Sequence, residues 1–159
     1  MTATSDNATS TKKAGVQFGA LVVGVVFILV GVAGFIPGLT TGYSSMRFAS
    51  HTSGAHLFDF FQVSILHNAV HLLFGVAGIL LSRRALSARN YLFYGGIGYG
   101  VLFLYGIVVP SMSAANFVPV NDADNFLHLV LAAGMIGLSL ILGRGPAEAK
   151  IGPQASAQG

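Results

Sequence analysis

One apolar stretch, residues 58–81, constrains the fold more than any other part of the chain. It is long enough to cross a bilayer as a helix, which takes about 20 apolar residues. It also carries Asn68, His67 and His71, polar side chains that are costly in lipid and usually face a partner helix, a ligand or a water-filled cavity. Because His67 and His71 are four residues apart, both rings leave the same face of a helix. The stretch therefore predicts a membrane-spanning helix with one buried polar face.

The composition of the whole chain also indicates a membrane protein. Hydrophobic residues make up 53% of the chain and charged residues 8%, and the mean hydropathy is +0.73. A soluble domain has about 25% charged residues. The 159 residues leave room for one compact bundle and no second soluble domain. The net charge of +3 comes from basic residues scattered at helix ends, so we expect the lipid bilayer and no nucleic acid as a partner. The absence of cysteine excludes thiolate metal sites and cysteine nucleophiles.

Four apolar segments predict an all-α fold, an integral membrane bundle of four antiparallel helices. The expected spans are residues 15–36, 58–81, 91–109 and 125–142. A polar loop is expected between the first two spans, over residues 37–57. The two ends of the chain, residues 1–14 and 144–159, have too few apolar residues to pack, so we expect both to be disordered cytoplasmic tails.

The basic residues predict how this bundle is oriented. Arg47 alone falls on one side of the expected membrane. The other side holds Lys12, Lys13, Arg83, Arg84, Arg89, Arg144 and Lys150. Lys and Arg collect on the cytoplasmic side of membrane proteins. We therefore expect both termini in the cytoplasm, and a location in the inner (plasma) membrane of a bacterium.

A short motif occurs twice in the chain. Asn-x-x-His-Leu begins at Asn68 in the second expected span and at Asn125 in the fourth. Both spans run from the outer side of the membrane to the inner side. The motif therefore indicates two helix pairs related by a parallel repeat.

The depth of the histidines is a test of this repeat. Counted back from the cytoplasmic arginines, His128 lies sixteen residues before Arg144, and His67 lies sixteen before Arg83. On this count His71 lies deeper than His128 by about 6 Å, at 1.5 Å per residue. A tilt of one helix would remove the offset.

Three motifs give the chain a resemblance to a known family. They are HNAVHLLFGVAG in the second span, GxGY ending at Tyr99 in the third, and the NDADN loop with Asn-x-x-His-Leu that opens the fourth. Together they resemble the actinobacterial membrane proteins grouped as domain of unknown function 4383. The resemblance covers residues 15–143. It implies a four-helix bacterial membrane protein and no particular activity.

The buried polar side chains allow two interpretations. In the first, Asn68, Asn125 and the histidines hydrogen-bond between helices, an interaction worth about 0.6 to 2 kcal/mol in membranes. The protein would then be a non-enzymatic structural or accessory membrane subunit. Glycine-rich faces on the first and third spans would receive a second copy or a larger membrane complex.

In the second interpretation the histidines bind a ligand. His67, His71 and His128 have the donor type for Zn²⁺ or Cu²⁺, and His71 with His128 could be the two axial ligands of haem b. Against a metal site, no carboxylate lies deep in any expected span and no HExxH motif is present. A hydrolase is not expected, because Ser64 precedes His67 on the same helix but no acid orients the histidine and no oxyanion donors are evident.

Asp59 lies two turns before His67, with His56 just beyond it, so these residues could continue the metal site outward. Whether His51 and His56 of the outer loop join the cluster stays open at this point.

Overall fold

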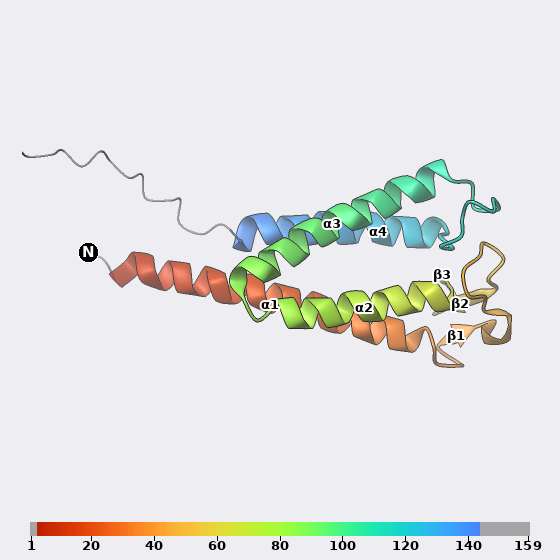
Figure 1. Ribbon diagram of the computed structural model, residues 1–159, viewed down its shortest axis with the longest axis horizontal. Coiled ribbons are helices and arrows are strands. Elements are labelled where there is room, and N and C mark those ends of the chain that lie inside the picture. Colours follow the sequence, from red (N-terminus) through yellow and green to blue (C-terminus); the bar gives the residue numbers. More distant parts are fainter. Residues whose placement is uncertain (1–2, 144–159) are drawn as a thin grey trace, which may run out of the picture.

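The computed structural model describes the backbone of residues 3–143 and the side chains of residues 14–143. Its four helices form an antiparallel bundle (Figure 1): α1 (Ala3–Ala33), α2 (Ile65–Leu81), α3 (Ala85–Val108) and α4 (Asp122–Leu142). Three of them, α1 over Ala14–Ala33, α3 and α4, are long and apolar enough to cross a membrane, and α2 is a shorter apolar helix. The predicted all-α bundle of four helices is confirmed.

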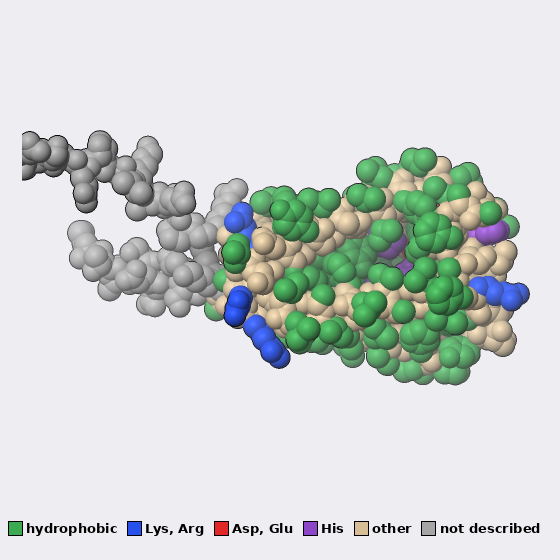
Figure 2. All heavy atoms as spheres, in the orientation of Figure 1, with side chains coloured by type: hydrophobic (Ala, Val, Ile, Leu, Met, Phe, Trp, Pro, Cys, Tyr) green, Lys and Arg blue, Asp and Glu red, His purple; other side chains and the backbone are tan. Residues whose placement is uncertain are grey.

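Apolar side chains cover the outside of the bundle. Leu73, Leu86, Val108 and Phe126 are 71%, 68%, 75% and 69% exposed. Figure 2 shows such side chains along one face, with Lys and Arg side chains at the two ends. Large contiguous apolar patches are rare on soluble monomers. The surface is suited to a lipid environment, where helices satisfy their own backbone hydrogen bonds.

Helix α2 is shorter than the predicted span. It begins at Ile65, so the prediction of a helix from residue 58 is wrong over its first two turns. Phe58 and Asp59 have φ angles of 50° and 65°, a left-handed backbone conformation that a right-handed helix of L-residues does not contain. The helix is about 26 Å long at 1.5 Å per residue.

The predicted outer loop over residues 37–57 is also folded. With the residues that follow it, it forms a three-stranded antiparallel sheet in the order β1 (Thr40–Thr41), β2 (Ala55–Leu57) and β3 (Phe61–Val63). The 3-10 turn η1 (Tyr43–Ser45) lies between β1 and β2. In the sheet register, Leu57 pairs with Thr40 on one side and with Phe61 on the other. Leu57 and Val63 pack on Ala33 at the end of α1, so the sheet covers the end of the α1–α2 pair that lies away from Arg83.

The other helix boundaries differ from the sequence-based expectation by shorter stretches. Helix α1 begins at Ala3, so the tail predicted for residues 1–14 is helical from Ala3 onward. Extending a helix that has already formed costs little, because each added residue also adds a hydrogen bond. Helices α3 and α4 begin at Ala85 and Asp122 instead of residues 91 and 125. The second predicted tail, residues 144–159, lies outside the described residues.

Glycines bring the helices of each sequential pair into close contact. A Cβ atom added at Gly24 of α1 would lie 2.9 Å from the carbonyl oxygen of Gly75 in α2. One added at Gly96 of α3 would lie 3.0 Å from the backbone nitrogen of Ile136 in α4. Only glycine permits such an approach. Gly24 and Gly96 therefore serve packing within the chain.

The two pairs are repeats in the same register. Gly24 corresponds to Gly96 with a constant offset of 72 residues between α1 and α3, and an offset of 57 residues relates α2 to α4. Under these offsets Gly75 corresponds to Ala132, and its contact with Gly24 has its equivalent in the contact of Ala132 with Gly96. The parallel repeat that the twofold Asn-x-x-His-Leu motif predicted is thus present in the packing.

The helix caps correct the predicted depths of the histidines. Ser64 caps α2 and Asn121 caps α4, and each accepts a hydrogen bond from a backbone N–H in the first turn. His71 and His128 each follow their cap by seven residues, so they are equivalent positions at one level. The 6 Å offset counted from the arginines is wrong, because α4 continues about one turn beyond the position equivalent to Leu81, where α2 ends.

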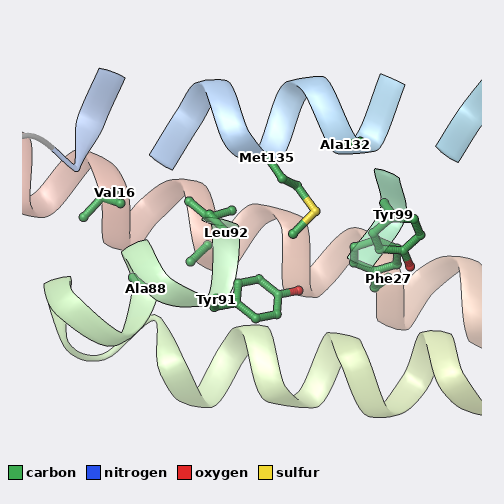
Figure 3. Packing of buried hydrophobic residues seen from close by; sticks show 9 residues of the cluster. Val16, Phe27, Ala88, Tyr91, Leu92, Tyr99, Ala132 and Met135 are labelled. Atoms are coloured by element: carbon green, nitrogen blue, oxygen red, sulfur yellow. The ribbon is translucent and has the colours of Figure 1, made fainter. Parts of the chain in front are cut away.

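The core lies between the two repeats (Figure 3). Three buried residues of α1 correspond to three buried residues of α3 under the same offset: Val16 and Ala88, Ala20 and Leu92, Phe27 and Tyr99. Helices α1 and α3 are therefore central, and α2 and α4 flank them on opposite sides. This arrangement turns the polar faces of α2 and α4 toward the middle of the bundle.

Candidate functional site

The site is organised around a pair of stacked aromatic rings. Phe27 of α1 and Tyr99 of α3 lie with ring centroids 5.3 Å apart and planes 15° apart. The imidazole of His71 lies 5.4 Å from the ring of Phe27, and the imidazole of His128 lies 5.5 Å from the ring of Tyr99. Because these pairs are equivalent in the repeat, the two histidines approach the centre from opposite flanking helices.

His67 completes the histidine cluster. Its ring centroid is 4.6 Å from that of His71 and 6.4 Å from that of His128. All three imidazoles are buried, with 6%, 7% and 3% of the surfaces of His67, His71 and His128 exposed. The structure therefore brings together the three histidines that the sequence singled out.

A small cavity lies beside the cluster, toward the sheet. Its volume is about 20 Å³, and His67, His71, His128 and Asp124 contribute the polar part of its wall. The Nδ1 atom of each histidine is buried and has no hydrogen-bond partner within the protein. A buried water molecule needs about 10–15 Å³ of such space and two to four polar partners. The cavity has room for one water molecule or one monatomic cation.

Asp124 is the carboxylate of the site, whereas sequence spacing suggested Asp59. It is 2% exposed, and its Oδ2 atom accepts hydrogen bonds from the backbone N–H groups of Gln62 and Asn121, both at 3.1 Å. The carboxylate thus joins strand β3 to the start of α4. It occupies the position equivalent to His67 in the repeat. The capping box formed by Asn121 and Asp124 is the sequence signal that identifies this buried turn.

The two asparagines have a separate role in the packing. Asn68 is fully buried, and its side-chain amide lies directly over the backbone of Gly34 at the end of α1. The amide of Asn125 lies over Gly106 of α3 in the same way. A Cβ atom at either glycine would overlap the amide. The predicted polar cluster of Asn68 and Asn125 is therefore a pair of equivalent contacts, each within one helix pair.

The outer-loop residues do not extend the site. His56 is half-buried on β2 and its Nδ1 atom lies 3.3 Å from the carbonyl oxygen of Gly54. Asp59 is exposed and accepts a hydrogen bond from the hydroxyl of Thr41. Neither of these residues, nor His51, lines the cavity beside the cluster. Residues 58 and 59 form a left-handed turn between β2 and β3.

The cavity limits which ligands the cluster can hold. Pockets for cofactor-sized molecules have volumes of about 300–1,000 Å³, so haem b between His71 and His128 does not fit a space of about 20 Å³. The donor types suit a metal ion, since three imidazoles and a carboxylate face one cavity. Among the side chains of residues 14–143, however, no three His, Asp or Glu groups have the spacing of a metal site. Metal binding would require changes of rotamer.

Comparison with known proteins gives one match. A family model described as Domain of unknown function (DUF4383) matches residues 17–141, which include all four helices. No curated protein and no solved structure matches the chain.

Proposed function

We propose that this chain, which belongs to the family grouped as domain of unknown function 4383, is a non-enzymatic multi-pass membrane protein in which the histidine cluster joins two helix-pair repeats. The observation that carries the proposal is the convergence of equivalent polar positions, His71 and His128, on the stacked rings of Phe27 and Tyr99. Buried polar groups that are satisfied specify one arrangement of a core. The cluster would fix how the repeats sit against each other, through an ordered water molecule in the cavity.

The charge distribution supports an orientation with both termini in the cytoplasm of a bacterium. Arg83, Arg84 and Arg89 lie at one end of the bundle. Arg47 lies at the other end, in the loop between η1 and β2. In the inner membrane, the sheet would cover the outer end of the α1–α2 pair. Strand β3 and the loop before α4, which the buried Asp124 joins by hydrogen bonds, would then lie on the outer side.

We further propose that the protein works as an accessory subunit of a larger membrane complex or as a homo-oligomer. The support is the breadth of the apolar exterior, which includes residues of all four helices. Native mass spectrometry and crosslinking in membranes test this part. A strictly monomeric protein in both measurements would contradict it.

The alternative function is metal binding by His67, His71 and His128. Their three unpartnered Nδ1 atoms and the carboxylate of Asp124 favour it. Elemental analysis of the purified protein decides between the two functions. We expect no stoichiometric metal. Zinc or copper at one ion per chain, lost in His67→Ala, would replace the proposed function with the alternative.

A substitution that keeps hydrogen bonding provides the second test. An amide both donates and accepts hydrogen bonds but lacks an imidazole nitrogen. We expect His71→Gln to fold and to lose less stability than His71→Ala, and His56→Gln on β2 is the control outside the cluster. Equal losses for His71→Gln and His71→Ala would contradict a hydrogen-bonding role.

A further inference from the structure

A groove of about 530 Å³ opens on the side of the bundle between α2 and α3. Phe74 and Tyr91 line it, with ring centroids 5.0 Å apart. On α3, Gly98 borders the groove, and a Cβ atom added there would meet no atom within 4 Å. Two polar side chains, Ser87 and Asn90, line the end nearest the α2–α3 connection. The volume falls within the range of about 300–1,000 Å³ found for ligand pockets.

The repeat supplies a comparison within the same molecule. The equivalent side of the bundle lies between α4 and α1, where Gly15 and Gly19 stand at the positions of Ser87 and Tyr91. There Leu142 approaches to 3.6 Å from a Cβ atom added at Gly15. Leucine side chains of α4 thus fill the side that is equivalent to the groove.

The different lengths of α2 and α4 explain why one side is open. Helix α4 continues to Leu142, whereas α2 ends at Leu81, one turn earlier in the repeat. No α2 side chain is therefore equivalent to Leu142. The α2–α3 side thus combines open space with polar side chains at one end.

The charge at that end selects the kind of ligand. Arg83, Arg84 and Arg89 lie at or next to the α2–α3 connection, and all three are exposed. The carboxylates within residues 14–143 belong to Asp59, Asp122 and Asp124, at the other end of the bundle. Each basic residue near a membrane surface attracts anionic lipid by about 1 kcal/mol. An apolar groove that ends beside three exposed arginines matches a molecule with a hydrocarbon chain and an anionic head.

We propose that the α2–α3 groove binds one anionic phospholipid. One acyl chain lies against Phe74, Tyr91 and Gly98, and the phosphate lies within reach of Arg84, Ser87 and Asn90. Such a ligand enters sideways from the bilayer without leaving it. The site is separate from the histidine cluster and does not depend on the role proposed for that cluster.

Native mass spectrometry in mild detergent measures this binding directly. The probes are phosphatidylglycerol and phosphatidylcholine with the same acyl chains, which differ in net headgroup charge. We expect phosphatidylglycerol to bind more tightly. Arg84→Gln should weaken its binding about fivefold, the factor that corresponds to ~1 kcal/mol for one basic residue.

Filling the groove tests the position of the acyl chain. Gly98→Leu places a side chain in open space, so the fold should persist while lipid contacts are lost and binding of phosphatidylglycerol falls by about tenfold. Gly134→Leu is the matched control, because Gly134 is an exposed α4 glycine whose added Cβ also meets no atom within 4 Å. The Gly134→Leu variant should bind phosphatidylglycerol as tightly as the unmodified protein does. Unchanged binding in Gly98→Leu would overturn the groove as the site. Equal binding of the two lipids, or no effect of Arg84→Gln, would overturn the anionic ligand.

Discussion

Phe27 and Tyr99 occupy equivalent positions of two helix-pair repeats and stack on each other, with ring planes 15° apart. A residue that contacts its own equivalent must lie close to the axis that relates the repeats. His71 and His128 flank this stack from α2 and α4. The two copies of the polar motif therefore meet at one place in the fold. At this place the two halves of the bundle are joined.

The stack predicts an energetic coupling between its two rings. Phe27→Ala and Tyr99→Ala should each lower the free energy of unfolding by about 3 kcal/mol, measured in SDS by far-ultraviolet circular dichroism. The double variant should lose about 1 kcal/mol less than the sum, because both changes remove the same aromatic contact. Phe126→Ala, at a residue that is 69% exposed, should change stability by less than about 0.5 kcal/mol. Strict additivity of the first two changes would contradict the coupling.

The contact between Asn68 and Gly34 predicts that the cost of a substitution at Gly34 depends on the side chain at position 68. Gly34→Ala should lower the free energy of unfolding by about 2 kcal/mol, because its methyl group overlaps the Asn68 amide. In an Asn68→Ala background the same change should be neutral or stabilising. Gly134→Ala, in open space, serves as the control. The idea fails if Gly34→Ala costs the same in both backgrounds. Gly106→Ala tested with and without Asn125→Ala should repeat the pattern in the second helix pair.

The buried carboxylate of Asp124 predicts a local effect where β3 meets the start of α4. Asp124→Ala removes the acceptor for the N–H groups of Gln62 and Asn121, and should lower stability by about 1–2 kcal/mol, as the loss of a helix cap does. Hydrogen exchange should become faster at those two amides. Asp122→Ala, two residues away and exposed, should leave both amides protected. Unchanged exchange in Asp124→Ala would show that the carboxylate does not join β3 to α4.

The proposed orientation predicts a labelling pattern in intact cells. The chain has no cysteine, so single cysteines report without background. A membrane-impermeant maleimide should label cysteine at the positions of Thr52 and Ala115 in the outer segments, and should fail to label it at those of Ser87 and Ser156. Permeabilised cells provide the control for reactivity at the inner positions. Labelling of the Ser156 position in intact cells would reverse the proposed orientation.

The sequence by itself determined the features that depend on local pattern. Apolar length and period indicate four helices, and the spacing of His67 and His71 places them on one polar face. The twofold Asn-x-x-His-Leu motif indicates the repeat because equivalent helices carry equivalent residues at one register. These inferences need only the geometry of a single helix.

Only the tertiary structure decided where α2 begins and which groups meet. The start at Ile65 follows the left-handed turn at Phe58 and the pairing of β3 with β2. This segment is held by residues far from it in the sequence, because β2 also pairs with β1 and the backbone N–H of Gln62 in β3 donates to Asp124. Sequence spacing suggested Asp59 as the neighbouring carboxylate, but Asp124 fills that place, since the chain folds back through the loop before α4. A residue's partners across helices are set by packing, and packing cannot be read from the period of one segment.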